Sequence, residues 1–261
     1  MKAIPLYEKR ALFIPSIKAV VIADLHIGIE YELFLNGVNI PSQTNILLQR
    51  CQDLGREKKA TTIILLGDVK HIIFHSKTKD YHTALRKERK DVYFFLSVLA
   101  EEFEVRLIKG NHDGGLKSKK ENVSIYGSKG ISIGKFGFVH GHAWPSQEVM
   151  ESDIIIMAHT HPVVHITNSF GYPITKPCWL KGRFAEELYK KYKIERKKKE
   201  IIVMPAFNPL CGGIAINREG ILGPLGKIVD LAHTRIYLLD GTYLGYVHTL
   251  HSFHRNCSTS K

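Results

Sequence analysis

The amino-acid sequence predicts an α/β (α+β) fold: a four-layer αββα sandwich in which two packed mixed β-sheets are flanked by helices. Two observations favour this fold class. The first half alternates short apolar runs with helical patterns, which is typical of parallel βαβ units. The later part changes to short strands joined by turns, which indicates a second sheet packed on the first rather than one doubly wound sheet.

Six apolar runs rich in Val, Ile and Leu indicate strands, and apolar residues follow one another in them without strict alternation. Both faces of these strands should therefore be covered. Between the first three runs the pattern is helical, with one helix placing Leu47, Cys51 and Leu54 on a shared face and a second covering about residues 81–102. The six runs are Ala19–Ala23, Thr62–Leu66, Val105–Ile108, Phe136–Val139, Asp153–Ala158 and Ile201–Met204.

Hairpins dominate the expected structure of the later part. Residues 131–139 contain two glycines and indicate a hairpin. Three short strands follow from residue 214 onward, and Asp240-Gly241 separates the last two of them. This dipeptide is typical of a type I′ turn.

We expect one domain over residues 1–261, with a basic insertion at about 176–200 and a β-rich extension at about 201–250 that completes the second sheet. The formal net charge of +12 is concentrated in two segments. Residues 176–199 carry ten Lys or Arg and three Glu, and residues 77–90 carry six Lys or Arg and two acidic residues. Such charge favours a polyanionic partner such as nucleic acid. The alternative is that both segments are only solvated faces.

Membrane and secretory classes do not fit the sequence. No apolar run approaches the roughly 20 residues of a membrane span. The first residues lack the apolar region of a signal peptide, because Glu8, Lys9 and Arg10 interrupt it. We therefore expect a cytoplasmic location and no membrane partner. The four cysteines form no C-x-x-C pair, which argues against a zinc ribbon and favours reduced thiols.

Five of the apolar runs end in side chains of the types that bind metals, at the carboxyl ends of strands, where α/β sheets place their sites. Residues i and i+2 of an extended segment point the same way, so Asp24 and His26 can bind one ion together. Asp68 stands alone after its strand, which suits a bridge between two ions. Oxygen and nitrogen ligands without thiolate favour Mn²⁺, Fe or Zn²⁺. The candidates are Asp24, His26, Asp68, Asn111, His140, His159 and His161.

The order of these motifs resembles the calcineurin-like metallophosphoesterase superfamily, whose pattern is D-x-H, GD, GNH-D/E, a single His after a strand, and GH-x-H. Ala158 stands where the family has Gly, and the GD motif is followed by Lys70 and His71 instead of leading toward a second Asp. The details are similar to the ICC-like phosphoesterases of prokaryotes, which include a ligase-associated endonuclease. The segments that carry this similarity are residues 67–71, 140–145 and 205–210.

The resemblance implies a role for each ligand and for two further residues. His112 would protonate the leaving group, and Asp113 would orient His112. A hydroxide bridging the two ions would attack phosphorus. The ions are expected to be Mn²⁺ first, with Fe, Zn²⁺ or Mg²⁺ as alternatives. One ion would take Asp24, His26, Asp68 and His161, and the other Asp68, Asn111, His140 and His159.

Several residues near the motifs keep alternative interpretations. His142 lies two positions after His140 and could replace it as ligand; otherwise it lies beside the ligands or at the substrate. His71 is expected beside the ligands, whereas His75 and His82 lie beside them or at the surface. Trp144 would either stack on a base or cover the site.

The expected function is a two-metal-ion phosphoesterase that hydrolyses phosphodiester bonds in nucleic acid or nucleotides. The alternatives are a small-nucleotide or phosphomonoester hydrolase, and a nucleic-acid-processing scaffold with a vestigial site. The complete ligand set argues against the scaffold. By the same resemblance, DNA-repair or single-strand-binding proteins are candidate partners.

Overall fold

The computed structural model describes residues 2–73, 78–118, 120–167, 170–195 and 197–252. Its first sheet joins an antiparallel N-terminal meander to a parallel core, because β3 to β6 all run in one direction. The strand order is β1-β2-β3-β4-β5-β6. These strands are β1 (Ile4–Leu6), β2 (Ala11–Ile14), β3 (Ala19–Ile22), β4 (Thr62–Leu66), β5 (Glu104–Ile108) and β6 (Val123–Tyr126).

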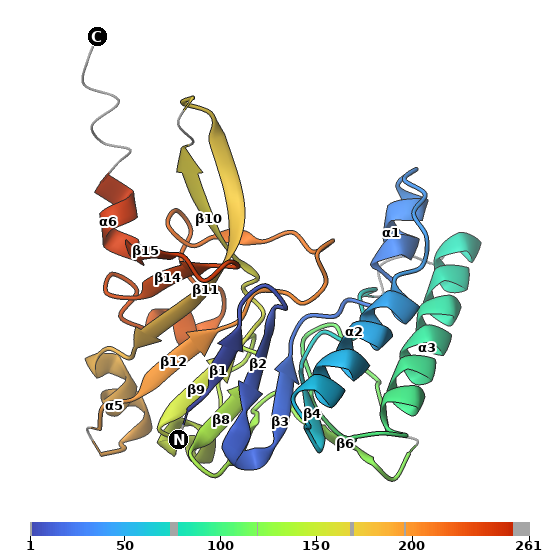
Figure 1. Ribbon diagram of the computed structural model, residues 1–261, viewed down its shortest axis with the longest axis horizontal. Helices are drawn as coiled ribbons and strands as arrows, with labels where there is room; N and C mark the ends of the chain where they lie inside the picture. The colour runs from blue at the N-terminus through green and yellow to red at the C-terminus, as the bar shows by residue number, and fades with distance from the viewer. Residues whose placement is uncertain (1, 74–77, 119, 168–169, 196, 253–261) are drawn as a thin grey trace.

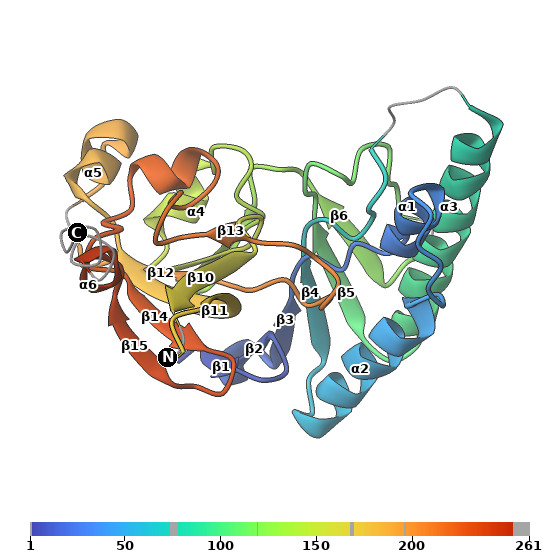
Figure 2. The ribbon, with the colours of Figure 1, turned by 90° about the horizontal axis from the view of Figure 1, so that it is seen from above.

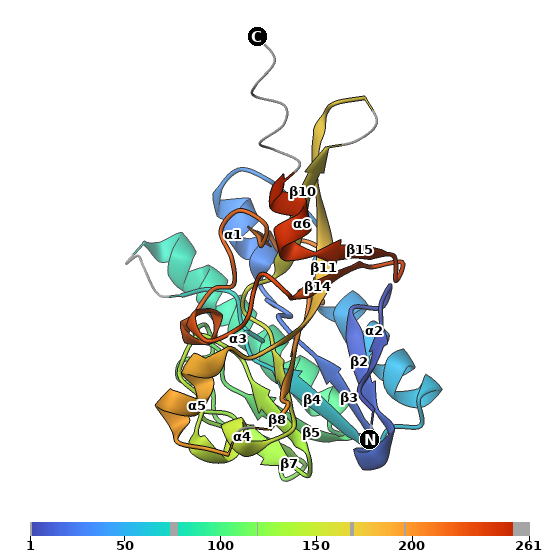
Figure 3. The ribbon, with the colours of Figure 1, turned by 90° about the vertical axis from the view of Figure 1, so that its left-hand side faces the viewer.

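The second sheet is mixed and has the order β13-β10-β11-β12-β9-β8-β7, with β14 pairing β11 and β15 pairing β14. The long strand β11 pairs with β10 through its first residues and with β12 and β14 through its last. The β10–β11 hairpin extends beyond the rest of the sheet (Figures 1 and 3). The strands are β7 (Ile131–Ile133), β8 (Phe136–Val139), β9 (Ile154–Met157), β10 (Pro162–Thr167), β11 (Pro173–Arg183), β12 (Glu200–Val203), β13 (Ile214–Ala215), β14 (Arg235–Leu238) and β15 (Tyr243–Tyr246).

Helices cover the outer faces of both sheets, as Figure 2 shows from above. On the first sheet lie α1 (Ile29–Leu35), α2 (Thr44–Glu57) and α3 (Lys79–Leu99). On the second lie α4 (Gln147–Glu151) and α5 (Glu186–Tyr192), and α6 (Val247–Ser252) follows β15. Short 3₁₀ helices span Pro15–Ile17 and Pro224–Lys227. Within the described ranges, none of the helices combines the length and the apolar character needed to cross a membrane.

The hydrophobic core has three layers, and the side chains of β4 show why. Ile63 and Leu65 pack against the helices α2 and α3, whereas Ile64 and Leu66 pack between the two sheets. All four are fully buried. Successive side chains of a strand point to opposite faces, so a strand covered on both sides needs apolar residues at every position. The third layer lies beneath α4 and α5 on the outside of the second sheet.

The αββα prediction is confirmed, and all six predicted apolar runs are strands. Strands β1, β2, β6 and β11 were not predicted from the sequence, and the last turn differs from the expected type I′. Gly241 has a φ of 84°, but Asp240 is not among the residues with positive φ. Leu238 N donates to Thr242 O at 2.9 Å, which closes a three-residue loop with its glycine in the left-handed position.

The basic segment at 176–200 does not form one separate surface element in this fold. Its first residues belong to β11 and its middle forms α5. Lys199 is buried, and its ammonium donates to the carbonyls of Glu151 at 2.6 Å and Ser152 at 2.9 Å at the end of α4. The proposed domain division stays a prediction.

Candidate metal centre

Polar side chains from loops of both sheets converge at one edge of the sandwich. The loops after β3, β4 and β5 carry Asp24, His26, Asp68 and Asn111, and those after β8 and β9 carry His140, His159 and His161. The carboxyl ends of these strands meet because β3, β4 and β5 are mutually parallel and β8 is parallel to β9. The structure thus brings all seven predicted ligands together.

Asp68 lies at the centre of this cluster. Its Oδ2 is 3.2 Å from His140 Nε2 and 3.7 Å from His26 Nε2. Asp68, His140 and His159 each offer a ligand atom within 4.8 Å of the others, and so do Asp24, His26 and Asp68. Asp68 is the member common to both groups, which is the position that a bridging carboxylate requires.

The carboxylate of Asp24 lacks the partners that a buried charge needs. It is fully buried, and neither oxygen has a hydrogen-bond partner among the described residues. Its nearest polar neighbours are His161 Nε2 at 3.4 Å and His140 Nδ1 at 3.6 Å, both measured to Oδ1. Burying an ionised carboxylate without hydrogen bonds is costly, and buried charges are paired or coordinate metals. The Asp24 carboxylate is therefore suited to coordinate a metal cation.

Backbone strain is concentrated at the same residues. Five of the seven predicted ligands have positive φ: Asp24 at 54°, His26 at 43°, Asp68 at 48°, His159 at 68° and His161 at 43°. A non-glycine residue in this region costs on the order of 1–3 kcal/mol, and such residues cluster at functional sites. The expected extended conformation at Asp24 and His26 was wrong, although their ligand atoms still lie within 4.8 Å of each other. The chain turns in the left-handed region at both residues.

Two glycines make room for the ligands. A Cβ on Gly67 would lie 2.2 Å from His140 Nδ1, and a Cβ on Gly110 would lie 2.0 Å from Asp68 Oδ1. Gly67 also has a φ of 82°. In the GD and GN motifs, the Asp or Asn is therefore a predicted ligand, and the glycine before it leaves the space that another predicted ligand occupies.

His140 occupies the position facing Asp68. Its Nδ1 donates to the Leu66 carbonyl at 3.0 Å, so its Nε2 points to Asp68 and, at 3.2 Å, to Asn111 Oδ1. Burial alone would lower the pKa of His140, but the hydrogen bond and charge of Asp68 outweigh it and raise the pKa to about 9. Once His140 Nε2 gives up its proton, it faces the same point as Asp68 Oδ2 and Asn111 Oδ1, and three such acceptors suit a cation. His142 is half-buried, and its ring centroid lies 6.0 Å from that of His159.

His112 and Asp113 differ from their expected relation. The His112 backbone N–H donates to Asp68 Oδ1 at 3.0 Å, and its Nδ1 donates to the His71 carbonyl. Asp113 does not orient the His112 ring, because all of its described hydrogen bonds go to backbone amides. It accepts from Val69 N at 3.0 Å, Lys70 N at 3.1 Å and Gly110 N at 2.9 Å. Asp113 thus ties the loops after β4 and β5 to each other.

His71 lies beside the ligands, next to His26. The two Nδ1 atoms are 3.1 Å apart, and His71 Nε2 lies 2.9 Å from Glu32 Oε2. Burial lowers the pKa of His26 to about 3, which keeps this imidazole neutral. His26, His71 and His112 form a further group whose ligand atoms lie within 4.8 Å of one another. Glu32, His71 and His26 are therefore connected in one polar chain.

Two residues of the segment after β12 complete the site and were missed as site residues. Asn208 is fully buried; its Nδ2 donates to Leu25 O at 2.9 Å, and its Oδ1 accepts from Leu210 N at 3.0 Å. It thereby holds the loop between Asp24 and His26. The Cys211 thiol lies within 4.8 Å of the ligand atoms of His26 and His161. Only the sequence neighbourhood of the Asn-Pro-Leu segment could have indicated either residue.

The remaining candidates lie away from the cluster. Trp144 packs beneath α5, with Lys191 Nζ 3.8 Å from its ring centroid. His82 is exposed on α3, and His75 lies outside the described residues. A cavity of about 240 Å³ opens over the ligands and is lined by His26, Asp68, Asn111, His112, His159 and His161, together with residues 212–214.

Comparison with family models matches residues 17–210, about three quarters of the chain, to the family described as calcineurin-like phosphoesterase. The chain belongs to this family. Membership supports a hydrolase and implies divalent metal ions, for which the clusters described above offer ligands.

Solved structures are similar to this chain at low sequence identity, and the first of those named here shares its fold. The nuclease MPE of Pseudomonas putida is 19% identical, with 91% of this chain and 92% of that chain covered and a TM-score of 0.51. Yfce, a phosphoesterase from E. coli, is 14% identical, with 87% and 96% covered and a TM-score of 0.39. Vps29 of Entamoeba histolytica, complexed with Zn²⁺, is 15% identical, with 86% and 94% covered and a TM-score of 0.28. No curated protein sequence matches the chain.

Proposed function

We propose that this protein is a two-metal-ion phosphodiesterase that acts on nucleic acid. The observation that carries the proposal is the convergence of predicted ligands from both sheets on Asp68, beside a buried Asp24 carboxylate that has no hydrogen-bond partner within the described part of the chain. One ion would be held by Asp24, His26, Asp68 and His161, and the other by Asp68, Asn111, His140 and His159.

The residues of the chain would divide the remaining work among them. When bound, the two ions would supply positive charge to the phosphoryl oxygens and acidify a water molecule. His112 presents its Nε2 to the cavity, because its Nδ1 is held by the His71 carbonyl. A proton on that Nε2 can pass to the leaving oxygen. Asp113 keeps the loops of Asp68 and Asn111 in register.

The donor set supports Mn²⁺ as the proposed metal, with Fe and Zn²⁺ as alternatives. Carboxylate, amide and imidazole groups suit Mn²⁺, Fe and Zn²⁺, whereas thiolates select softer ions. Cys211 is the thiol near the centre, and burial raises its pKa, which keeps it in the neutral, weakly ligating form. The ligands thus remain oxygen and nitrogen atoms at neutral pH.

Charge supports nucleic acid as the substrate class. The formal net charge is +12, and α3, which borders the loops of the centre, carries Arg86 and Arg89 at i, i+3 spacing beside those loops. Lys and Arg side chains that contact phosphates make binding strong and dependent on salt. The fold neighbour MPE is described as a nuclease. Cytoplasmic location stays a prediction.

The test measures Mn²⁺-dependent hydrolysis of bis(p-nitrophenyl) phosphate and of single-stranded DNA, duplex DNA, RNA, cyclic nucleotides and phosphomonoesters. Asp68→Ala should lower diester turnover by more than about 100-fold, the upper range for residues that only support ligands. It should also lower the number of bound ions measured by elemental analysis. Asp53→Ala removes an exposed carboxylate on α2 and serves as control. Undiminished turnover in Asp68→Ala would contradict the two-ion mechanism, and preference for monoesters would favour the alternative hydrolase.

A further inference from the structure

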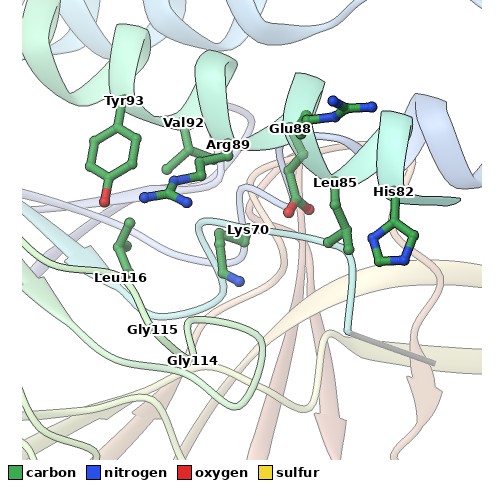
Figure 4. A pocket seen from close by; sticks show the side chains of 11 residues that line it. Lys70, His82, Leu85, Glu88, Arg89, Val92, Tyr93, Gly114, Gly115 and Leu116 are labelled. Carbon is green, nitrogen blue, oxygen red and sulfur yellow. The ribbon is translucent and has the colours of Figure 1, made fainter. Parts of the chain in front are cut away.

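A second cavity lies outside the metal centre, between the N-terminal half of α3 and the loops that follow β4 and β5 (Figure 4). Its volume is about 640 Å³, compared with about 240 Å³ over the ligands. Pockets for small molecules and cofactors typically measure roughly 300–1,000 Å³. The cavity is therefore large enough to hold a nucleotide-sized group.

The walls of this cavity and the metal centre share two loops. Lys70 lines the cavity and lies two residues after Asp68, so their Cα atoms are at most ~7 Å apart. Gly114 lines it as well and lies two residues after His112. The buried Asp113 carboxylate joins the two loops between these positions. The cavity and the metal centre are therefore lined by neighbouring residues of the same two loops.

The rim of the cavity is cationic. Lys70, Arg86 and Arg89 contribute three positive charges. The carboxylate in the lining is Glu88, which is buried and whose Oε1 accepts hydrogen bonds from the backbone amides of His71, at 2.8 Å, and Ile72. Because three cationic side chains outnumber this one carboxylate, the net charge of the lining is positive. Such a rim suits a phosphate.

The interior of the cavity is apolar and partly aromatic. Leu85, Val92 and Leu116 form its apolar surface, and Tyr93 adds an aromatic ring with Arg89 Cζ 5.8 Å from its centroid. Figure 4 shows Tyr93 and Arg89 on the helix facing Leu116 and Lys70 on the opposite side. Bases bind proteins by packing on aromatic and apolar side chains, and their phosphates bind Arg and Lys. One ligand that satisfies both requirements is a nucleotide.

We infer that this cavity is a subsite for the nucleotide adjacent to the scissile phosphodiester, so that the substrate is a polynucleotide strand rather than a mononucleotide or a phosphomonoester. The inference rests on the proposed phosphodiesterase function. It assigns two consecutive parts of one strand to the two phosphate-binding sites. One phosphate would lie at the metal centre and the other beside Arg86 and Arg89.

The test compares two double variants of α3 that lose the same charge. Arg86→Ala/Arg89→Ala changes the cavity, whereas Lys87→Ala/Lys90→Ala changes exposed residues of the same helix at the same spacing that do not line it. The measured quantity is the ratio of kcat/KM on a single-stranded oligonucleotide to kcat/KM on bis(p-nitrophenyl) phosphate. The arginine variant should lower this ratio by about tenfold or more, mainly through KM, and reduce the salt slope of oligonucleotide binding by about two. The lysine variant should keep the ratio within about twofold.

A cavity-filling variant separates the shape of the subsite from its charge. Leu85→Trp puts a larger apolar side chain on the cavity wall and should also lower the ratio. The inference is overturned if the wild type cleaves oligonucleotides but the arginine and Leu85 variants behave like the lysine variant. It is also overturned if both substrates lose activity equally, because that indicates damage to the metal centre, or if the wild type hydrolyses the small diester alone. Hydrolysis of neither substrate with any metal would instead remove the proposed function itself.

Discussion

The two sheets contribute different chemistry to the same centre. Loops of the first sheet supply both carboxylates, Asp24 and Asp68, with the Asn111 amide and one imidazole. Loops of the second sheet supply imidazoles only. The close contacts cross between the sheets, with His140 Nε2 at 3.2 Å from Asp68 and His161 Nε2 at 3.4 Å from Asp24. Neither sheet carries all seven predicted ligands, so the proposed centre depends on the packing of one sheet against the other.

Both sheets nevertheless present most of their predicted ligands, all but Asn111 and His140, with the same local backbone conformation. Left-handed residues follow β3 and β4 in the first sheet and β9 in the second. A parallel strand ends, and the next one or two polar residues turn sharply enough to keep their side chains at the strand end. The sheets thus differ in ligand type and agree in the conformation that holds the ligands.

The largest expected effect comes from removing the imidazole through which the second sheet contacts Asp68. His140→Ala should lower diester turnover by more than about 100-fold and release one ion. The reason is that the ion proposed to bind Asp68, Asn111 and His140 would lose the imidazole ligand. His142→Ala is the matched control two residues along the chain. Diester turnover and the metal content by elemental analysis are measured for both variants. If His142→Ala loses the ion and His140→Ala keeps it, the assignment of the two histidines is reversed.

A smaller effect is expected from adding a side chain to the backbone beside Asp68 in the first sheet. Gly110→Ala places a Cβ 2.0 Å from Asp68 Oδ1, which must displace the carboxylate and lower metal affinity about 10- to 100-fold. Gly127→Ala has no atom within 4 Å of the added Cβ and tests the general effect of alanine. Titration with Mn²⁺ measures both. Equal affinities in the two variants would show that Asp68 does not need its present position.

The next prediction compares a buried asparagine beside the centre with one in the turn after β13, beside the second sheet. Asn208 bonds the Asp24–His26 loop, and Asn217 bonds both backbone groups of His165 at 3.0 and 2.8 Å. Alanine at either position should lower the free energy of unfolding by about 1–3 kcal/mol, because buried partners lose their hydrogen bonds. Denaturant unfolding measures this loss. Only Asn208→Ala should also weaken Mn²⁺ binding. An equal loss of Mn²⁺ affinity in Asn217→Ala would contradict the role of Asn208 in holding the Asp24–His26 loop.

The smallest expected effect concerns Glu88, beneath the loops of the first sheet. Burial raises its pKa to about 7, above the value near 4.5 that it has when unfolded. The folded state therefore holds a proton that the unfolded state has released, and the contribution of Glu88 to stability is full below pH 4.5 and lost as the pH rises through about 7. Glu88→Gln should remove a slope of about 1 kcal/mol per unit between about pH 5.5 and 6.5. Thermal unfolding across this window measures the slope, and parallel curves would contradict the burial effect.

The sequence was sufficient to predict the strands that carry the ligands, and the reason is visible in β4. Both faces of this strand are covered, so its residues are apolar at every position and contrast sharply with Gly67 and Asp68 at its end. β11 was missed because it has no such contrast: Lys176, Lys181 and Gly182 interrupt it, and its first part is exposed.

What the sequence could not show is the geometry that depends on distant residues. Asp113 follows His112 directly, which suggested a contact between them, yet its carboxylate is taken by amides of the loop after β4, some 43 or 44 positions away. The Cys211 thiol lies near the Asp24 carbonyl, 187 positions away, and no local pattern indicates that contact. The left-handed conformation of the ligands is equally hidden, because Asp and His also occupy ordinary strands and turns.

The hydrogen bond between Asn208 and Leu25 joins residues 183 positions apart and has a consequence for biosynthesis. Ribosomes add ~5–20 residues per second, so on the order of 10–40 s separates the appearance of Leu25 from that of Asn208. His140, His159 and His161 also emerge late, long after Asp24 and Asp68. A nascent chain consequently exposes its two carboxylates well before it can enclose an ion, and we expect the hydrolytic centre to mature only once most of the polypeptide has been translated.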